Sequence, residues 1–219
     1  AAPTWEDAGG GAFEYDNTSN IYSSSITTLS YRTTATNNFI AGVSAGSSIT
    51  SGSSNNFFGN GAGTYNTTGR CNNFIGFNAG YCNTTGSYNN FFGYLAGYCN
   101  TTGCRNTFIG DQAGRYNTIG SCNNFIGYRA GLCNTTGCFN IFIGSDVGFC
   151  NTTGSSNNFF GYQAGLFNTT GSCNNFFGYQ AGYCNTIGVD NNFFGTGSGR
   201  CNTTGRCNNF IGFNAGYCN

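Results

Sequence analysis

The sequence predicts an all-β protein, a parallel β-solenoid of the β-helix or β-roll type, because one short unit recurs along most of the chain. From Asn55 onward a phenylalanine returns every 17 residues, which sets the length of one coil. Each unit also contains three glycines, each costing roughly 1 kcal/mol in a helix. Its other residues are mainly Asn, Thr and aromatic types, which suit turns and short strands. We therefore expect about ten stacked 17-residue coils.

Positions in a coil are counted from the recurring phenylalanine at 0, and the unit reads N-N-F-[FI]-G-[YF]-x-A-G-[YL]-C-N-T-T-G-x-[CS]. Like residues should lie above one another, so asparagines at −2 and +9 should form amide ladders and position 0 an aromatic core. The core stack expected is Phe57, Phe74, Phe91, Phe108, Phe125, Phe142, Phe159, Phe176, Phe193 and Phe210. An eleventh unit begins at Asn37 and is one residue longer, since Phe39 and Phe57 are 18 apart.

Within a coil, N-F-[FI]-G is expected to be a strand, A-G-[YL]-C a second strand and N-T-T-G a turn. Coils about 4.8 Å apart would build a rod of roughly 50 Å. Residues 37–219 form the predicted solenoid. Residues 1–36 do not follow the repeat and are predicted to be a separate segment that caps the first coil or docks on another subunit.

Two large apolar residues stand side by side at positions 0 and +1 in every regular unit. Neighbouring strand residues point to opposite faces, so one should fill the coil and the other face outward. Ten outward Phe or Ile side chains form an apolar stripe that is too large to remain exposed to solvent on a soluble monomer, so a partner is expected to cover it. The alternative is a bulge that turns both side chains inward.

The composition excludes several functions. Seven basic and seven acidic residues leave no basic face for nucleic acid, and no apolar run is long enough for a membrane span. With no histidine there is no His-dependent triad, and Asp111 and Asp190 lack a carboxylate partner at useful spacing. Neither an enzyme nor a cofactor is expected. Position +4 places Arg129 next to Asp146, which we interpret as part of a surface ladder.

Thirteen cysteines indicate an oxidising, extracellular setting. They fall in two columns, at +8 and at −3 or −4, and are too evenly spread for a zinc site. Neighbours in the +8 column suit disulfides that staple adjacent coils, namely Cys82–Cys99, Cys133–Cys150 and Cys184–Cys201. The rival scheme closes the turn within the chain, through Cys99–Cys104, Cys133–Cys138 and Cys201–Cys207. Because the count is odd, Cys218 is the candidate for an intermolecular bond.

Eight Asn-x-Ser/Thr sequons are candidate glycosylation sites. They lie at Asn17, Asn66, Asn83, Asn100, Asn134, Asn151, Asn168 and Asn202. The other interpretation is that N-T-T-G is only a turn, because the units with N-T-I-G at Asn117 and Asn185 keep the turn and lose the sequon.

The motif N-x-F-I-G-x-x-A-G, as in Asn123–Gly131 and Asn174–Gly182, resembles the glycine-rich repeats of bacterial and phage tail-fibre-like surface proteins. More distantly it is similar to the β-roll heads of trimeric autotransporter adhesins. The resemblance implies a parallel β-solenoid, often trimeric, on a cell-surface or virion appendage. This chain departs from those repeats in its many cysteines.

Residues 206–219 are identical to residues 70–83, so the last coil is written like an internal one. An open strand edge invites pairing with another chain, and a head-to-tail contact that does not close builds a filament. The sequence thus favours a structural subunit of an extracellular filament, which binds itself head to tail, with lateral pairing through the second apolar stripe as a further mode of contact. The alternatives are an adhesin or tail-fibre shaft that forms a homotrimer, and an ice-binding protein with stacked threonines.

Overall fold

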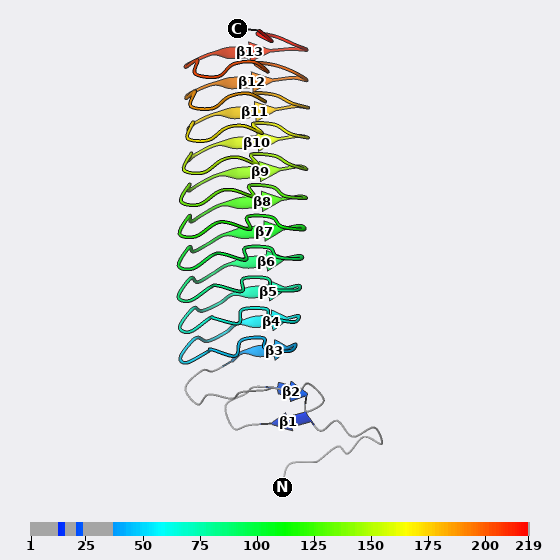
Figure 1. The fold of residues 1–219 in the computed structure, drawn as a ribbon, viewed down its shortest axis with the longest axis vertical. Helices are drawn as coiled ribbons and strands as arrows, with labels where there is room; N and C mark the ends of the chain where they lie inside the picture. The colour runs from blue at the N-terminus through cyan, green and yellow to red at the C-terminus, as the bar shows by residue number, and fades with distance from the viewer. Residues whose placement is uncertain (1–12, 16–20, 24–36, 219) are drawn as a thin grey trace.

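The structure, a computed structural model, describes residues 13–15, 21–23 and 37–218. Its main body is a straight rod of stacked coils that share one parallel sheet (Figure 1). The eleven parallel strands are β3 Phe39–Ala41, β4 Asn56–Phe58, β5 Asn73–Ile75, β6 Asn90–Phe92, β7 Thr107–Ile109, β8 Asn124–Ile126, β9 Ile141–Ile143, β10 Asn158–Phe160, β11 Asn175–Phe177, β12 Asn192–Phe194 and β13 Asn209–Ile211. The predicted β-solenoid is confirmed. The described residues contain no helix that could cross a membrane.

Two further strands, β1 (Phe13–Tyr15) and β2 (Ile21–Ser23), extend the sheet beyond β3. They pair with each other antiparallel, and β2 pairs with β3 through Ile21 and Phe39. These strands are the described parts of the predicted N-terminal segment, whose remaining residues lie outside the described part of the chain.

Each strand residue pairs with the residue 17 positions further along, as Phe108 does with Phe125. The same register holds in the first coil, where Ile40 pairs with Phe57 and Phe39 pairs with Asn56. The prediction of a longer first unit anchored on Phe39 is therefore wrong. Ile40 takes position 0 and packs against the core, whereas Phe39 takes position −1 on the outside. The first coil begins at Asn38 and has the same length as the others.

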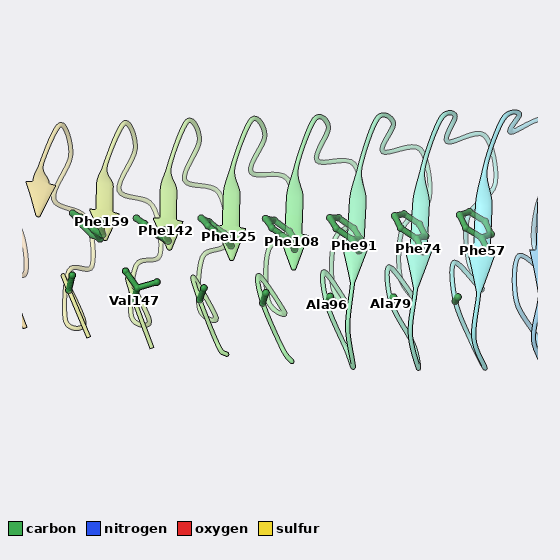
Figure 2. Packing of buried hydrophobic residues seen from close by; sticks show 14 of the residues in the cluster. Phe57, Phe74, Ala79, Phe91, Ala96, Phe108, Phe125, Phe142, Val147 and Phe159 are labelled. Atoms are coloured by element: carbon green, nitrogen blue, oxygen red, sulfur yellow. The ribbon is translucent and has the colours of Figure 1, made fainter. Parts of the chain in front are cut away.

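The phenylalanines at position 0 form the predicted core stack. Their ring centroids lie 4.6–5.0 Å apart and neighbouring rings are within 13° of parallel. Every ring from Phe57 to Phe193 is fully buried, while Phe210 in the last coil is partly covered. Figure 2 shows the rings in file behind the strands, with small residues such as Ala79, Ala96 and Val147 on the opposite wall. The core is thus one aromatic ring thick, and each ring is covered by the coils on either side.

Position +1 faces outward, as alternation along a strand requires. Ile109 keeps 40 % of its surface exposed although the adjacent Phe108 is fully buried. The bulge that would have turned both side chains inward is therefore excluded.

The second predicted strand, A-G-[YL]-C, is a turn instead. In the β7 coil Gln112 and Gly114 both have positive φ, near 57° and 56°, and such residues interrupt an extended backbone. Glycine is required at +6 because a Cβ on Gly114 would lie 2.6 Å from the Phe108 ring. The turn still bonds to the next coil, since the Gly114 amide donates to the Ala130 carbonyl at 2.9 Å. Coil-to-coil bonding therefore continues outside the strands.

Two buried amide ladders run along the rod, as predicted. At +9, Asn134 Nδ2 donates to Asn117 Oδ1 at 2.8 Å and to the Gly137 carbonyl at 3.0 Å. The second bond spans N-T-T-G and closes that bend. At −2, Asn123 Oδ1 accepts from the Asn140 backbone amide at 2.9 Å. Buried amides are tolerated only when hydrogen-bonded, so these ladders also hold the coils in register.

Removal of one ring should open a cavity that the stacked coils cannot close. We expect Phe142→Ala to lower the free energy of unfolding by about 3–5 kcal/mol. The control, Phe139→Ala, removes the same group from a side chain that is 64 % exposed, and it should stay within about 0.5 kcal/mol of the parent protein. Chemical denaturation of both variants measures the difference, and equal losses would contradict the assignment of the core.

Candidate functional site

The chemically reactive groups lie in columns along the surface of the rod. Among the described residues no group of three or more His, Cys, Asp or Glu side chains could hold a metal ion. The columns to consider are the thiols, the sequon asparagines, the few charges and the outward apolar side chains.

Each predicted disulfide pair lies in neighbouring coils, and all thirteen cysteines are free thiols in the structure. Burial raises the pKa of the Cys82 thiol, and the nearby Cys99 raises that pKa further. Burial and the adjacent Cys133 raise the pKa of Cys150 in the same way. For Cys184 the order is again burial and then Cys201, while Arg200 acts in the opposite direction. The pairs are therefore adjacent, and disulfide formation between them stays a prediction.

Two cysteines of the other column have a role that the sequence analysis missed. At position −4, serine and cysteine side chains accept a backbone hydrogen bond from the preceding coil. The Ser121 amide donates to Cys138 Sγ at 3.3 Å, and the Cys138 amide donates to Ser155 Oγ at 3.0 Å. Cys104 lies in the same kind of arrangement between Ser87 and Ser121. The alternation of Ser and Cys at −4 was the signal that these thiols substitute for hydroxyls. Cys218, the candidate for an intermolecular bond, is exposed.

The structure corrects the glycosylation prediction for the seven sequons in the coils. Their asparagines all occupy +9 and have at most 2 % of their surface exposed. Six of them, from Asn83 to Asn202, donate Nδ2 in the amide ladder, and Asn66 Nδ2 donates to the Gly69 carbonyl. A glycan on Nδ2 would replace a ladder hydrogen and would have no path to solvent. The N-T-T-G motif therefore recurs because it forms this turn. Asn17, the eighth sequon, lies outside the described residues.

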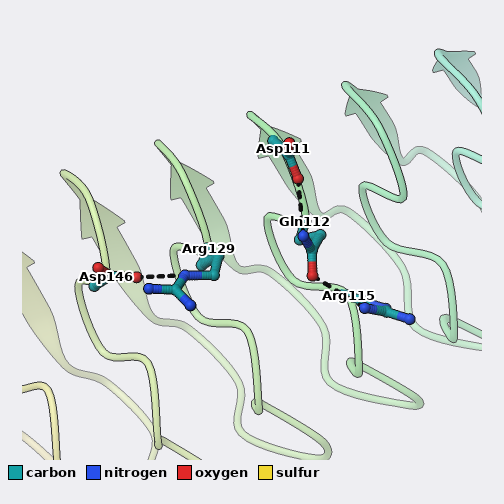
Figure 3. Close-up of polar contacts among 5 residues, drawn as sticks. All are labelled: Asp111, Gln112, Arg115, Arg129 and Asp146. Carbon is teal, nitrogen blue, oxygen red and sulfur yellow. Dashed lines mark hydrogen bonds and ion pairs between the residues drawn. The ribbon is translucent and has the colours of Figure 1, made fainter.

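Arg129 and Asp146 form an ion pair, and Gln112 lies between Asp111 and Arg115 (Figure 3). Arg129 Nε donates to Asp146 Oδ1 at 2.7 Å, and this bond raises the pKa of the guanidinium. The Arg129 guanidinium also lies 4.7 Å from the Tyr128 ring centroid. Gln112 bridges two charges, since its Nε2 donates to Asp111 Oδ1 at 3.1 Å and its Oε1 accepts from Arg115 at 3.0 Å. These contacts reinforce the stack, and they bring no two carboxylates together for acid–base chemistry.

One exposed surface runs along the whole stack and is called the outward face, defined as positions −1 and +1 of the strands together with the bordering position +3. Position −1 is mostly Asn, +1 is Phe or Ile, and +3 is Tyr or Phe in six of the regular coils, namely at Phe77, Tyr94, Tyr128, Tyr162, Tyr179 and Phe213. Some neighbouring rings on it stack, as Phe160 and Phe177 do at 4.6 Å. The outward face is therefore a continuous, half-exposed and largely apolar surface along the rod.

Comparison of the chain with protein-family models, with curated proteins and with solved structures finds no match.

The buried thiols should make the reduced protein sensitive to alkali. A thiol in the unfolded chain loses its proton near pH 8.5, whereas the folded thiols, with raised pKa, still hold theirs. Above that pH the unfolded state binds fewer protons, so the stability falls as the pH rises through the folded pKa. We expect the Tm of the reduced protein to fall between pH 7.5 and 9.5.

The double variant Cys133→Ser, Cys150→Ser should flatten this decline relative to the parent protein, because two of the responsible groups are gone. Cys173→Ser, which replaces an exposed thiol, is the control and should keep the parent slope. Thermal melts across the pH series decide the matter, and identical slopes in all three proteins would refute the role of burial.

Proposed function

We propose that this chain is a structural subunit of an extracellular filament, in which solenoid rods join end to end. The proposal is carried by one observation: in the described coils, the buried rings and amides make their contacts with the adjacent coils. The Phe and Asn columns form continuous stacks, and the threonine hydroxyls at +10 donate to the carbonyl of the following coil, as Thr135 does to Thr152 at 3.1 Å. A stack whose last strand has an unpaired edge is suited to extension by a strand of a further copy.

The two outermost strands of the sheet are β1 and β13, so end-to-end assembly joins β13 of one copy to β1 of the next. In the last described coil, two side chains are more exposed than their counterparts in inner coils, which supports this joint. Ile211 and Phe213 are each 78 % exposed, against 40 % and 45 % for Ile75 and Phe77 at the same positions of an inner coil. The sequence of the β13 coil is that of the β5 coil, so it offers the surface on which β6 already stacks.

The cysteine-rich composition supports the extracellular location, where adjacent thiols of the +8 column would oxidise to staple neighbouring coils. A closed loop of this length contributes about 3 kcal/mol. The threonine columns favour a structural role over ice binding, because the +10 hydroxyls are used between coils and the exposed +11 column is a single row that Ile119 and Ile187 interrupt. No observation favours the homotrimeric shaft over the filament.

End-to-end assembly is tested by electron microscopy of the purified protein at increasing concentration. We expect filaments whose length grows with concentration, and Phe210→Asp should leave short rods, because a carboxylate would replace the ring that ends the core stack. Thr136→Asp adds the same charge at an exposed site in the middle of the rod and should still form filaments. Isolated short rods of the parent protein at every concentration would contradict the proposal.

The disulfide staples are tested by peptide mapping without reductant after secretion into an oxidising medium. We expect to recover the linked peptides Cys82–Cys99, Cys133–Cys150 and Cys184–Cys201. Cys99→Ser should free Cys82 for alkylation and leave the other two links intact. Links of the type Cys133–Cys138 would instead support closure within the turn.

A further inference from the structure

We propose that two copies of this chain pair laterally through the outward face, with their rods antiparallel and a two-fold axis along β8. This contact is separate from the end-to-end contact and does not rest on it.

Hydrogen bonds along the rod already occupy many polar groups of the outward face. The asparagines at −1 of β4–β6 and of β10–β13 bond to one another, as Asn158 Nδ2 does to Asn175 Oδ1 at 2.8 Å. Asp111 is the single charged side chain on the face, and Gln112 already donates to it. A partner of opposite charge would therefore find nothing to recognise. The attraction that remains is apolar, from the half-exposed Phe and Ile at +1 and the aromatic side chains at +3.

The exposed apolar area is sufficient for a stable pair. Side chains such as Ile109 and Tyr128 are 40 % and 46 % exposed. At about 200 Å² for a large side chain, the two columns together expose on the order of 1,000 Å². A typical monomer has a largest apolar patch of about 300–600 Å², and a stable interface buries about 800 Å² on each partner. The exposed apolar area of the outward face is larger than the largest patch of a typical monomer, and it is large enough for a stable interface.

The spacing of the face selects another copy of this chain as its occupant. Its side chains recur once per coil in straight columns, because β3 to β13 lie directly above one another (Figure 1). The side chains of each coil form a ridge, and a groove lies between adjacent coils. Only a second surface with the same rise of about 4.8 Å places a ridge in every groove along the whole rod. An identical sheet has that rise.

The order of residues at +3 is symmetric about the β8 coil. From β3 to β13 the column reads Val43, Asn60, Phe77, Tyr94, Asp111, Tyr128, Ser145, Tyr162, Tyr179, Thr196 and Phe213. Its polar residues form two pairs that are the same number of coils from Tyr128. Asp111 and Ser145 are each one coil away, and Asn60 and Thr196 are each four coils away. All the remaining positions are apolar or aromatic. Read from either end, the column therefore has the same pattern.

The other two columns of the face share this centre. At −1, asparagine is replaced between β4 and β12 only in the mirrored strands β7 and β9, by Thr107 and Ile141, and Phe39 of β3 opposite Asn209 of β13 is a departure. At +1, Ile109 mirrors Ile143 and Phe92 mirrors Phe160, while Ile75 opposite Phe177 is the one departure between β4 and β12. Columns off the face lack the symmetry. At +8, Tyr116 would mirror Cys150, and at +11, Ile119 would mirror Thr153.

A two-fold axis along β8 explains the pattern. It turns one rod upside down over the other, so each column faces its own counterpart and β7 lies opposite the partner's β9. At position +3, polar residues then meet polar residues, and aromatic rings meet aromatic or apolar residues. Asp111, the single charge, lies opposite Ser145 of the partner subunit, whose hydroxyl can donate to the carboxylate. A parallel pair would not use this symmetry, because it would place position +3 opposite position −1.

Pairing is tested by sedimentation equilibrium, with Phe210→Asp as the background so that end-to-end growth does not interfere. We expect a dimer mass. Ile126→Lys, which buries an ammonium at the centre of the face, should weaken dimerisation about 100-fold. Thr136→Lys carries the same charge in the same coil on an exposed site off the face, and it should leave the dimer unchanged. A monomer at all concentrations, a trimer, or equal effects of the two lysines would overturn the proposal.

The antiparallel arrangement is tested by mixing two single variants of that background, Asp111→Lys and Ser145→Glu. If residue 111 of one copy lies opposite residue 145 of the other, the mixed dimer joins lysine to glutamate. The Ser145→Glu homodimer instead places glutamate against aspartate. Native mass spectrometry should therefore show the mixed dimer in clear excess over a random mixture. A random mixture of the three dimers would overturn the antiparallel geometry, even if a dimer forms.

Discussion

The fold depends on the stacking of identical residues between adjacent coils. One coil cannot bury its own phenylalanine, because the ring is covered by the rings above and below at about 4.8 Å. The same holds for its buried asparagines, whose amides find partners in the neighbouring coils. Stability is therefore a property of the array. Each coil contributes an interface to its neighbour, as in other repeat proteins with nearest-neighbour contacts.

This constraint explains why the sequence tolerates change at some positions and not at others. Glycine at +2 stays because a Cβ on Gly110 would lie 2.4 Å from the carbonyl oxygen of Gly127 in the next coil. By contrast, position +4 accepts Leu, Gln, Arg and Asp although every residue there has positive φ, because its side chain is not required by the core. Positions that build the Phe stack, the Asn ladders and the close backbone approaches are fixed, and position +4, which none of these uses, varies.

Much of the fold could be predicted from the period alone. The parallel strands, the Phe stack, both Asn ladders and the outward position +1 all follow from a 17-residue repeat and from alternation along a strand. The register of the first coil was mistaken because Phe39 looks like the core residue, while burial is decided by Asn38 continuing the −2 ladder. The A-G-[YL]-C turn was missed because its left-handed residues include ordinary side chains such as Gln112, which carry no turn signal. The glycosylation prediction was wrong for a related reason, because Asn recurs at +9 for the hydrogen bonds of its buried amide.

A direct test of the account measures how separation grows with the number of coils. Spin labels on non-canonical residues at exposed +11 positions avoid the native thiols, and pulsed EPR can compare the pairs 68/136 and 68/170, four and six coils apart. The account predicts separations of roughly 19 Å and 29 Å, an increase of about 4.8 Å per coil. Separations that do not rise in proportion to the number of coils would contradict stacking in register.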